Sequence, residues 1–212
     1  MRRTLGWLLL AASPAIAAEH DWSVTSGSAV GPAHLALQFQ VGWPELSGAG
    51  YYGFNDKLDL GLRLAFAYGG DGSIGFGPGV APGFRVQPTA RYALLESGIV
   101  RLGAWFSPGF GMDSILGIAT PRILLPLGVT LGIVPSEALA FHVGLDLPVY
   151  ISPGPFSGLT FPILVGGGVE YHLDKAMALT AQARMGPAIE LSRSGAPAHF
   201  ALRVFGGLAY RL

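Results

Sequence analysis

Alternation between apolar and polar residues continues to the last residue of the chain, and it constrains the fold more than any other feature. In residues 200–212 every second position is apolar or glycine, ending with Tyr210 and Leu212, while Arg203 and Arg211 fall on the other face. A period of two is that of a β-strand, whose successive side chains point to opposite sides. The chain therefore ends in a strand with one face suited to hydrocarbon and another that holds charge.

The same alternation recurs along most of the chain. From residue 57 onward it predicts eight strands, at residues 58–68, 83–94, 100–106, 123–133, 139–150, 161–173, 177–185 and 200–212. Two more strands are expected from residues 22–54, broken at Pro44, because residues 35–43 also alternate well. Single-chain bacterial barrels have even strand numbers. The predicted fold is therefore all-β, an antiparallel up-and-down transmembrane β-barrel, with ten strands preferred and eight or twelve as alternatives.

The connections between these segments fall into two length classes. Tight turns are predicted at residues 55–57, 96–97, 135–137 and 174–175. Longer linkers rich in Gly, Pro and Ser are predicted at residues 69–82, 108–120, 152–158 and 191–198. Short turns at one end and longer loops at the other are typical of transmembrane barrels.

Composition agrees with a protein whose outer surface faces lipid. Charged residues make up 12% of the chain, hydrophobic residues 50%, and the mean hydropathy is +0.47. An ordinary globular domain has about 25% charged residues. Basic and acidic residues are equally frequent, 13 each, so no basic excess points to nucleic acid. There is no cysteine, so disulfides cannot stabilise the fold. The most apolar stretch, residues 123–134, is too short for a spanning helix, which needs about 20 residues.

The first residues have the features of a secretory signal. Arg2 and Arg3 precede a short apolar core, and Pro14 is followed by small residues up to Ala17. These features predict a signal peptide over residues 1–17 and a barrel domain over residues 18–212. No cysteine follows the cleavage region, so a lipoprotein anchor is not expected.

The terminal strand resembles the C-terminal assembly signal of bacterial outer-membrane β-barrel proteins. That family favours a terminal aromatic residue preceded by aromatic or apolar residues at alternate positions; here Tyr210 matches, whereas Leu212 stands where Phe is usual. The resemblance implies a small porin-like or OmpA- and OmpW-like barrel in the outer membrane of a Gram-negative bacterium. It also implies contact with outer-membrane lipids and recognition of the C-terminal strand by the barrel-assembly machinery.

A barrel of eight to ten strands is narrow, and side chains fill its interior. The inward face carries both acidic and basic residues, which are expected to pair. The predicted polar network in the lumen comprises Arg63, Arg91, Arg101, His142, Asp146, Glu170, Arg184 and Arg203, with Gln38, Gln40, Asp59, Arg85, Gln87, His172, Gln182 and Arg211 as further inward candidates. Many other inward positions are Gly or Ala, which leaves room for water or a thin ligand.

One group of neighbouring side chains is compatible with catalysis or metal binding. If the strands around the 152–158 loop pair, His142 and Glu170 come within diagonal reach, near Asp146 and His172. A histidine beside a carboxylate is a general-base or weak metal pair, but a structural ion pair in a polar lumen accounts for it equally. No Gly-x-Ser-x-Gly motif is present, and residues 75–79 lack the Lys-Ser/Thr of a phosphate loop. We therefore expect no catalytic residue, no cofactor and no metal.

Three functions are compatible with the sequence. The first is a non-enzymatic outer-membrane barrel with a structural, adhesive or narrow passive-transport role. The second is an outer-membrane barrel enzyme that acts on lipid or peptide. The third is a soluble periplasmic lipid-binding barrel, which would be apolar inside and polar outside. Continuous apolar faces opposite arginine-bearing faces favour lipid on the outside.

Overall fold

The computed structural model describes residues 22–69, 82–115, 118–153, 157–192 and 198–212. The predicted signal peptide lies outside the described residues. The strands are β1 (Leu35–Trp43), β2 (Glu45–Gly53), β3 (Leu58–Ala67), β4 (Gly83–Ser97), β5 (Val100–Phe106), β6 (Gly109–Ile115), β7 (Ile118–Ser136), β8 (Leu139–Ser152), β9 (Gly158–Pro162), β10 (Leu164–His172), β11 (Met177–Ser192) and β12 (Ala198–Arg211).

The strands form one closed antiparallel ring. Neighbouring strands pair in chain order, and β12 closes the ring against β1 in a register that sets Phe39 opposite Leu208. β5 and β6 both pair with β4 and β7, and β9 and β10 both pair with β8 and β11. Each of these two pairs therefore acts as one interrupted strand, and the barrel has ten strands, which confirms the preferred prediction.

A proline lies at each interruption. Proline lacks an N–H group and cannot donate to the ladder, so a strand can break or turn where it occurs, although Pro88, Pro126 and Pro148 lie within continuous strands. Pro44 separates β1 from β2, Pro108 lies between β5 and β6, and Pro162 ends β9. The predicted break at Pro44 is confirmed.

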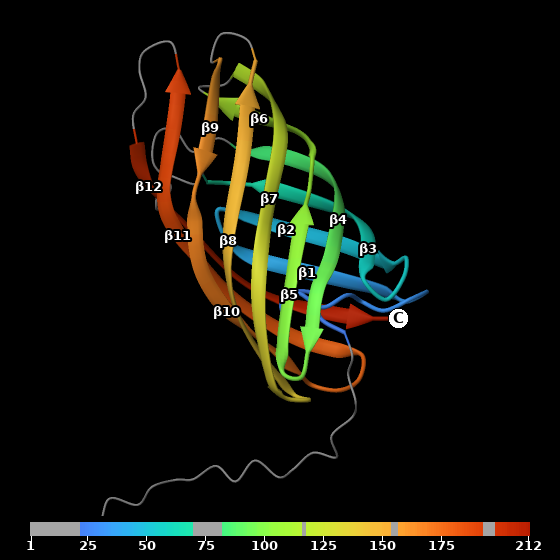
Figure 1. Cartoon of the computed structure of the whole chain (residues 1–212). Coiled ribbons are helices and arrows are strands. Elements are labelled where there is room, and N and C mark those ends of the chain that lie inside the picture. The colour runs from blue at the N-terminus through green and yellow to red at the C-terminus, as the bar shows by residue number, and fades with distance from the viewer. Residues whose placement is uncertain (1–21, 70–81, 116–117, 154–156, 193–197) are drawn as a thin grey trace, which may run out of the picture.

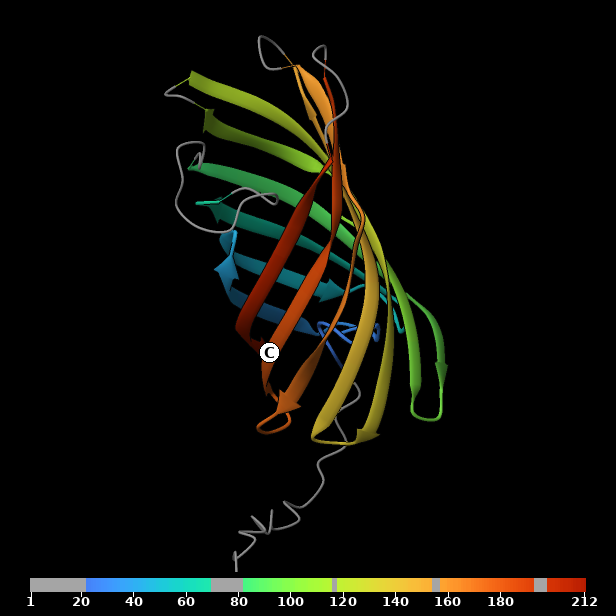
Figure 2. The same ribbon diagram turned by 90° about the vertical axis from the view of Figure 1, so that its left-hand side faces the viewer.

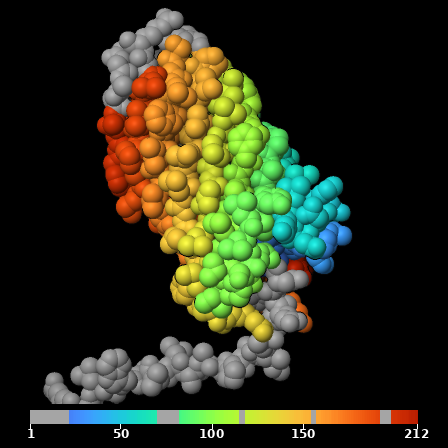
Figure 3. Space-filling view, viewed as in Figure 1, coloured from blue at the N-terminus to red at the C-terminus, as the bar shows by residue number. Residues whose placement is uncertain are grey.

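The outer wall of the barrel is apolar. Large hydrophobic side chains at alternate positions point outward, including Leu62 (48% exposed) in β3, Val143 (55%) in β8 and Phe200 (55%) in β12. Side chains of neighbouring strands form a continuous wall from β12 across β8 and β7 to β4 (Figure 3). A soluble lipid carrier needs the opposite polarity. The part of the chain described contains no helix long and apolar enough to cross a membrane.

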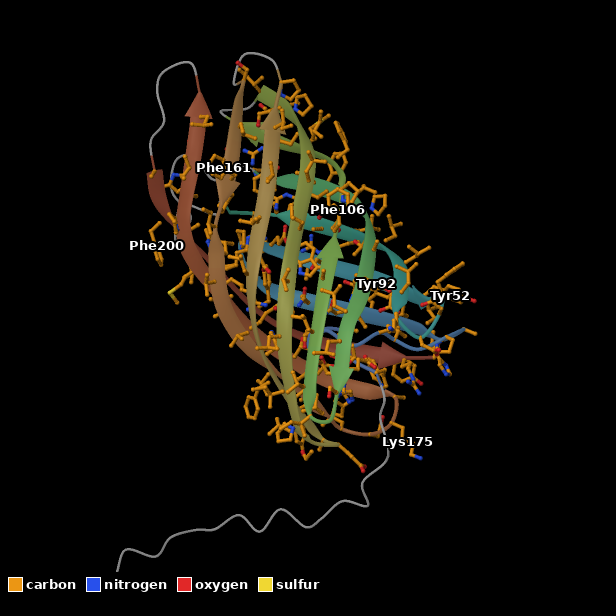
Figure 4. All side chains as sticks on the ribbon, in the orientation of Figure 1. Tyr52, Tyr92, Phe106, Phe161, Lys175 and Phe200 are labelled. Atoms are coloured by element: carbon orange, nitrogen blue, oxygen red, sulfur yellow. The ribbon has the colours of Figure 1, made fainter. Side chains whose placement is uncertain are left out.

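The two ends of the barrel differ. The turns after β2, β4, β7 and β10, and the end of β12, lie together at one end, which we call the short-turn end (Figure 1). Tyr52 and Tyr92 lie toward this end, with Lys175 in a turn beyond the wall, whereas Phe161 and Phe200 lie toward the opposite, long-loop end (Figure 4). β7 has 19 residues and β11 has 16, against nine in β1, so the wall is taller on one side (Figure 2).

One sequence prediction is wrong. Within residues 108–120, predicted as a long linker, residues 109–115 form β6 and residues 118–120 begin β7; the outward Phe110 and Met112 alternate with inward glycines and Asp113, a pattern that the Gly-rich composition obscures. The two strands expected from residues 22–54 are β1 and β2, and residues 22–34 precede them outside the sheet. The predicted linkers at 69–82, 152–158 and 191–198 lie partly outside the described residues.

Candidate functional site in the barrel lumen

Residues 22–31, which we call the plug segment, lie inside the ring of strands at the short-turn end (Figures 1 and 2). Trp22, Val24 and Val30 are buried and pack with Tyr51 and with the small wall residues Ala36, Ala178 and Ala209. The Trp22 indole donates to the Lys175 carbonyl oxygen at 3.0 Å and meets the His172 ring edge-on at 5.1 Å. The plug segment thus fills the space that the small inward residues of the wall leave at the short-turn end.

Glu170 of β10 holds the first part of the plug segment. Its Oε2 accepts hydrogen bonds from the Ser23 hydroxyl at 2.6 Å, from the Thr25 N–H at 3.0 Å and from the Thr25 hydroxyl. His172 Nε2 lies 3.3 Å from Oε1. The carboxylate is fully buried, so these donors replace the water that it would otherwise bind.

Asp59 of β3 and Arg91 of β4 hold the second part. Both carboxylate oxygens of Asp59 accept from the Val30 N–H, at 3.0 and 3.1 Å. Arg91 Nη2 donates to the carbonyl oxygens of Ser23 and Ser28 at 2.8 and 2.9 Å, and its Nη1 lies 3.6 Å from Asp59. Because these contacts are made with main-chain groups, they depend on the path of the segment more than on its side chains.

Wall glycines make space for the plug segment. A Cβ atom on Gly132 of β7 would lie 2.1 Å from the Ser26 carbonyl oxygen, and one on Gly103 of β5 would lie 2.6 Å from that of Gly27. Gly27 itself has φ +92°, a conformation that residues with a Cβ rarely adopt. Any larger residue at Gly103 or Gly132 would push against the segment.

A cavity of ≈ 170 Å³ lies against the plug segment, with Val24, Thr25 and Ser28 in its lining. Five arginines and three carboxylates contribute to that lining: Arg63, Arg85, Arg91, Arg184 and Arg203, with Glu45, Asp59 and Asp146. The described lining thus carries an excess of two positive charges. Low-dielectric walls strengthen the attraction of such an excess for anions.

Ion pairs join arginines to carboxylates in and beside this cavity. Glu45 of β2 is buried and pairs with both Arg63 and Arg85, the latter at 2.9 Å. Arg184 Nε lies 3.2 Å from Asp146. Around Tyr150, Arg203 donates to the phenol oxygen while the guanidinium carbons of Arg85 and Arg122 lie 5.4 and 5.9 Å from the ring centroid. Arg122 is paired with Asp113 at 2.8 Å.

The structure places the predicted network in two parts of the lumen and at its edge. Arg91 and Glu170 contact the plug segment, whereas Arg63, Arg184, Arg203 and Asp146 line the cavity. Arg101 instead donates to the Gly98 and Val100 carbonyl oxygens at the β4–β5 turn, at 2.6 and 3.1 Å, and does not join the cavity lining.

The His142–Glu170 constellation has the predicted register. His142 pairs with Gly168 across β8 and β10, which makes Glu170 its diagonal neighbour. The close histidine–carboxylate pair is nevertheless His172–Glu170 on one strand, and the hydroxyls of Ser23 and Thr25 donate to the carboxylate. Among the described residues, no group of three or more His, Cys, Asp or Glu side chains could hold a metal ion.

The sequence did not predict the roles of Glu45, Asp113, Arg122 and Tyr150, nor the plug segment. Glu45 follows Pro44 at the end of the alternating segment, and Asp113 lies in a segment whose composition predicts a loop. One available signal was the concentration of inward Ala and Gly near the short turns, because a lumen cannot leave such a volume empty.

Searches of protein-family models and of curated proteins find no match to the chain. Among solved structures, the chain is similar to a KdgM porin, with 13% identity over 84% of this chain and 98% of the other and a TM-score of 0.37. It is also similar to a KdgM porin in complex with disordered oligogalacturonate, with 13% identity over 84% of this chain and 98% of the other and a TM-score of 0.36. A third similar structure is OmpT, an outer membrane protein of Vibrio cholerae, with 12% identity over 84% of this chain and 95% of the other and a TM-score of 0.28. At the level of fold, the closed barrel confirms the resemblance to outer-membrane β-barrel proteins.

Proposed function

We propose that the protein is an integral outer-membrane barrel for narrow passive transport, and that its lumen prefers small anionic solutes. The location is supported by the apolar outer wall, which would be costly in water and is suited to lipid. Contact with outer-membrane lipids follows from that location. Assembly through the barrel-assembly machinery is part of the proposal, on the basis of the alternation in β12 that ends at Tyr210 and Leu212.

The observation that carries the anion preference is the excess of arginine over carboxylate in the cavity lining. Clustered cationic side chains in a confined pore favour anions and repel cations. Glu45 is shared by two arginines, so the positive excess is not removed by local pairing. Phosphate and carboxylate solutes share the required negative charge, and the lumen provides no further basis for choosing between them.

A tenfold KCl gradient across a planar bilayer tests this proposal with the full-length mature protein. We expect the reversal potential of open events to have the sign of chloride selectivity. Arg203→Gln, which removes a cavity charge, should reduce that potential, whereas Arg101→Gln at the rim should leave it unchanged. Cation selectivity in the parent protein, or an equal effect of both variants, would contradict the anion preference.

A structural barrel without conduction is the second candidate, and one observation favours it: the plug segment packs inside the lumen at the short-turn end. The absence of an enzymatic role remains part of our proposal. It is supported by the contacts of Glu170, whose Oε2 accepts from the Ser23 hydroxyl, the Thr25 N–H and the Thr25 hydroxyl and is thereby used to hold the plug segment. A barrel that never conducts, even with the plug segment displaced, would favour the structural candidate.

A further inference from the structure

We propose that the plug segment, residues 22–31, is a releasable stopper, which closes the short-turn end of the lumen and leaves it without unfolding the barrel. Release joins the arginine-lined cavity to the short-turn end. The stopper thereby regulates the proposed transport, and its effect on conduction rests on that proposed function.

The first argument is that the plug segment is not part of the wall. In the described part of the chain, the nearest backbone pairing to a strand is at its base, where Ala33 N–H donates to the Gly53 carbonyl oxygen at 2.8 Å. Residues 22–30 are held by side chains of Glu170, Asp59, Arg91 and Arg211. The Trp22 indole also donates to the Lys175 carbonyl oxygen. The ladder between β12 and β1 closes the barrel independently of the segment.

The second argument is that release does not leave the buried charged side chains of the wall without a neighbouring partner. Asp59 and Arg91 stay within 3.6 Å of each other on the wall, and Glu170 keeps His172 beside it. Water that enters from the short-turn end can replace the main-chain groups of the segment. The carboxylates and the guanidinium that bind the segment can therefore exchange its main-chain groups for water.

The third argument is a hinge at the base of the segment. Gly31 has φ +95° and Ala33 has φ 59°, and residues 32–34 are exposed between the buried segment and β1. Burial of Trp22 opposes release, because only 2% of the surface of this residue is exposed in the closed form. The closed form is therefore the ground state, and loss of the polar contacts shifts the equilibrium toward the open form.

A thiol reporter tests release directly. The chain contains no cysteine, and the Ser26 hydroxyl is buried and makes no hydrogen bond with the described residues, so Ser26→Cys replaces it without breaking a bond. The rate of labelling by a polar maleimide is measured on the folded, heat-modifiable fraction alone. In this background, Glu170→Gln and Asp59→Asn should each raise the rate by about tenfold or more, because each removes charge-assisted hydrogen bonds to the segment.

Asp146→Asn is the matched control, since it removes one carboxylate charge from the lumen without contacting the plug segment. Its labelling rate should equal that of the Ser26→Cys parent. If Glu170→Gln fails to fold, Gly132→Leu displaces the segment by steric contact with Ser26 instead. Equal labelling in the parent, the folded Asp59→Asn variant and the folded Gly132→Leu variant would overturn the stopper.

Conductance separates this inference from the proposed function. The same variants are recorded in planar bilayers, and a synthetic peptide of residues 22–33 is then added on the short-turn side. We expect more frequent openings in the release variants and block by the peptide. Faster labelling without any conductance would uphold the stopper and contradict the transport function, whereas higher conductance without faster labelling would overturn the stopper.

Discussion

The carboxylate of Glu170 accepts a 2.6 Å hydrogen bond from the hydroxyl of Ser23, although 147 positions separate the two residues in the chain. This bond joins a segment near the start of the described chain to a strand on the barrel wall. Arg211 of β12, whose guanidinium lies 5.8 Å from the Trp22 ring centroid, reaches the same segment from a neighbouring part of the wall. Wall residues at the short-turn end of the lumen therefore converge on the plug segment.

Gly132→Leu should displace the plug segment while the barrel stays closed. The new side chain would overlap the Ser26 carbonyl oxygen, whereas the ladders of β7 with β5 and β8 remain intact. Limited proteolysis should cut within residues 22–31 of this variant and not of the parent. Gly206→Leu is the control, because a Cβ at Gly206 meets nothing within 4 Å; cleavage of both variants at equal rates would contradict the account.

Glu45→Gln should destabilise the barrel by about 3–5 kcal/mol, because it leaves Arg63 and Arg85 without their shared counter-charge. Urea unfolding from lipid vesicles measures the change in the free energy of unfolding. Glu190→Gln is the matched variant: the Glu190–His199 pair is 3.8 Å apart and partly exposed, so the effect should stay within about 0.5 kcal/mol. Similar stabilities for both variants would show that the Glu45 cluster does not stabilise the fold.

Leu62→Arg should destabilise the protein in a bilayer by about 2–4 kcal/mol, because Leu62 points outward from the middle of β3 and would place a charge against hydrocarbon. Asp56→Arg, in the turn after β2, should have little effect. The free energy of unfolding from vesicles is again the measurement. A tolerated arginine at residue 62 would mean that this face does not contact lipid.

Trp22 should report the position of the plug segment by fluorescence. With Trp7, Trp43 and Trp105 replaced by Phe, emission comes from Trp22, which is buried beside His172 and Arg211. We expect emission at short wavelength and weak quenching by iodide. Adding Asp59→Asn should increase the quenching; strong quenching before that substitution would place Trp22 in water and contradict its burial.

The strand pattern could be predicted from the sequence because a period of two records which face of each strand meets lipid. Alternation therefore predicts the outward face that Leu62, Val143 and Phe200 occupy, and it predicts the number of strands. The extent of β6 and of the far end of β11 was not predicted, because glycine and proline there resemble loop composition even though the strands continue.

The lumen was harder to predict than the wall. Period two shows that Glu170 and Asp59 point inward, but not what they bind, since the partners come from a segment without alternation. Residues 22–31 contain small and polar residues typical of a linker, and their burial depends on a wall that forms only when β12 meets β1. The pairing of Glu45 with two arginines likewise depends on the register of three strands.

Heat modifiability of the protein in isolated membrane fractions tests most directly the claim that this chain is a closed outer-membrane barrel with its apolar face in lipid. We predict that the protein is found in the outer-membrane fraction, needs detergent for extraction and migrates differently on a gel before and after boiling. A protein that is found in the soluble periplasm and shows no shift on boiling would contradict the account.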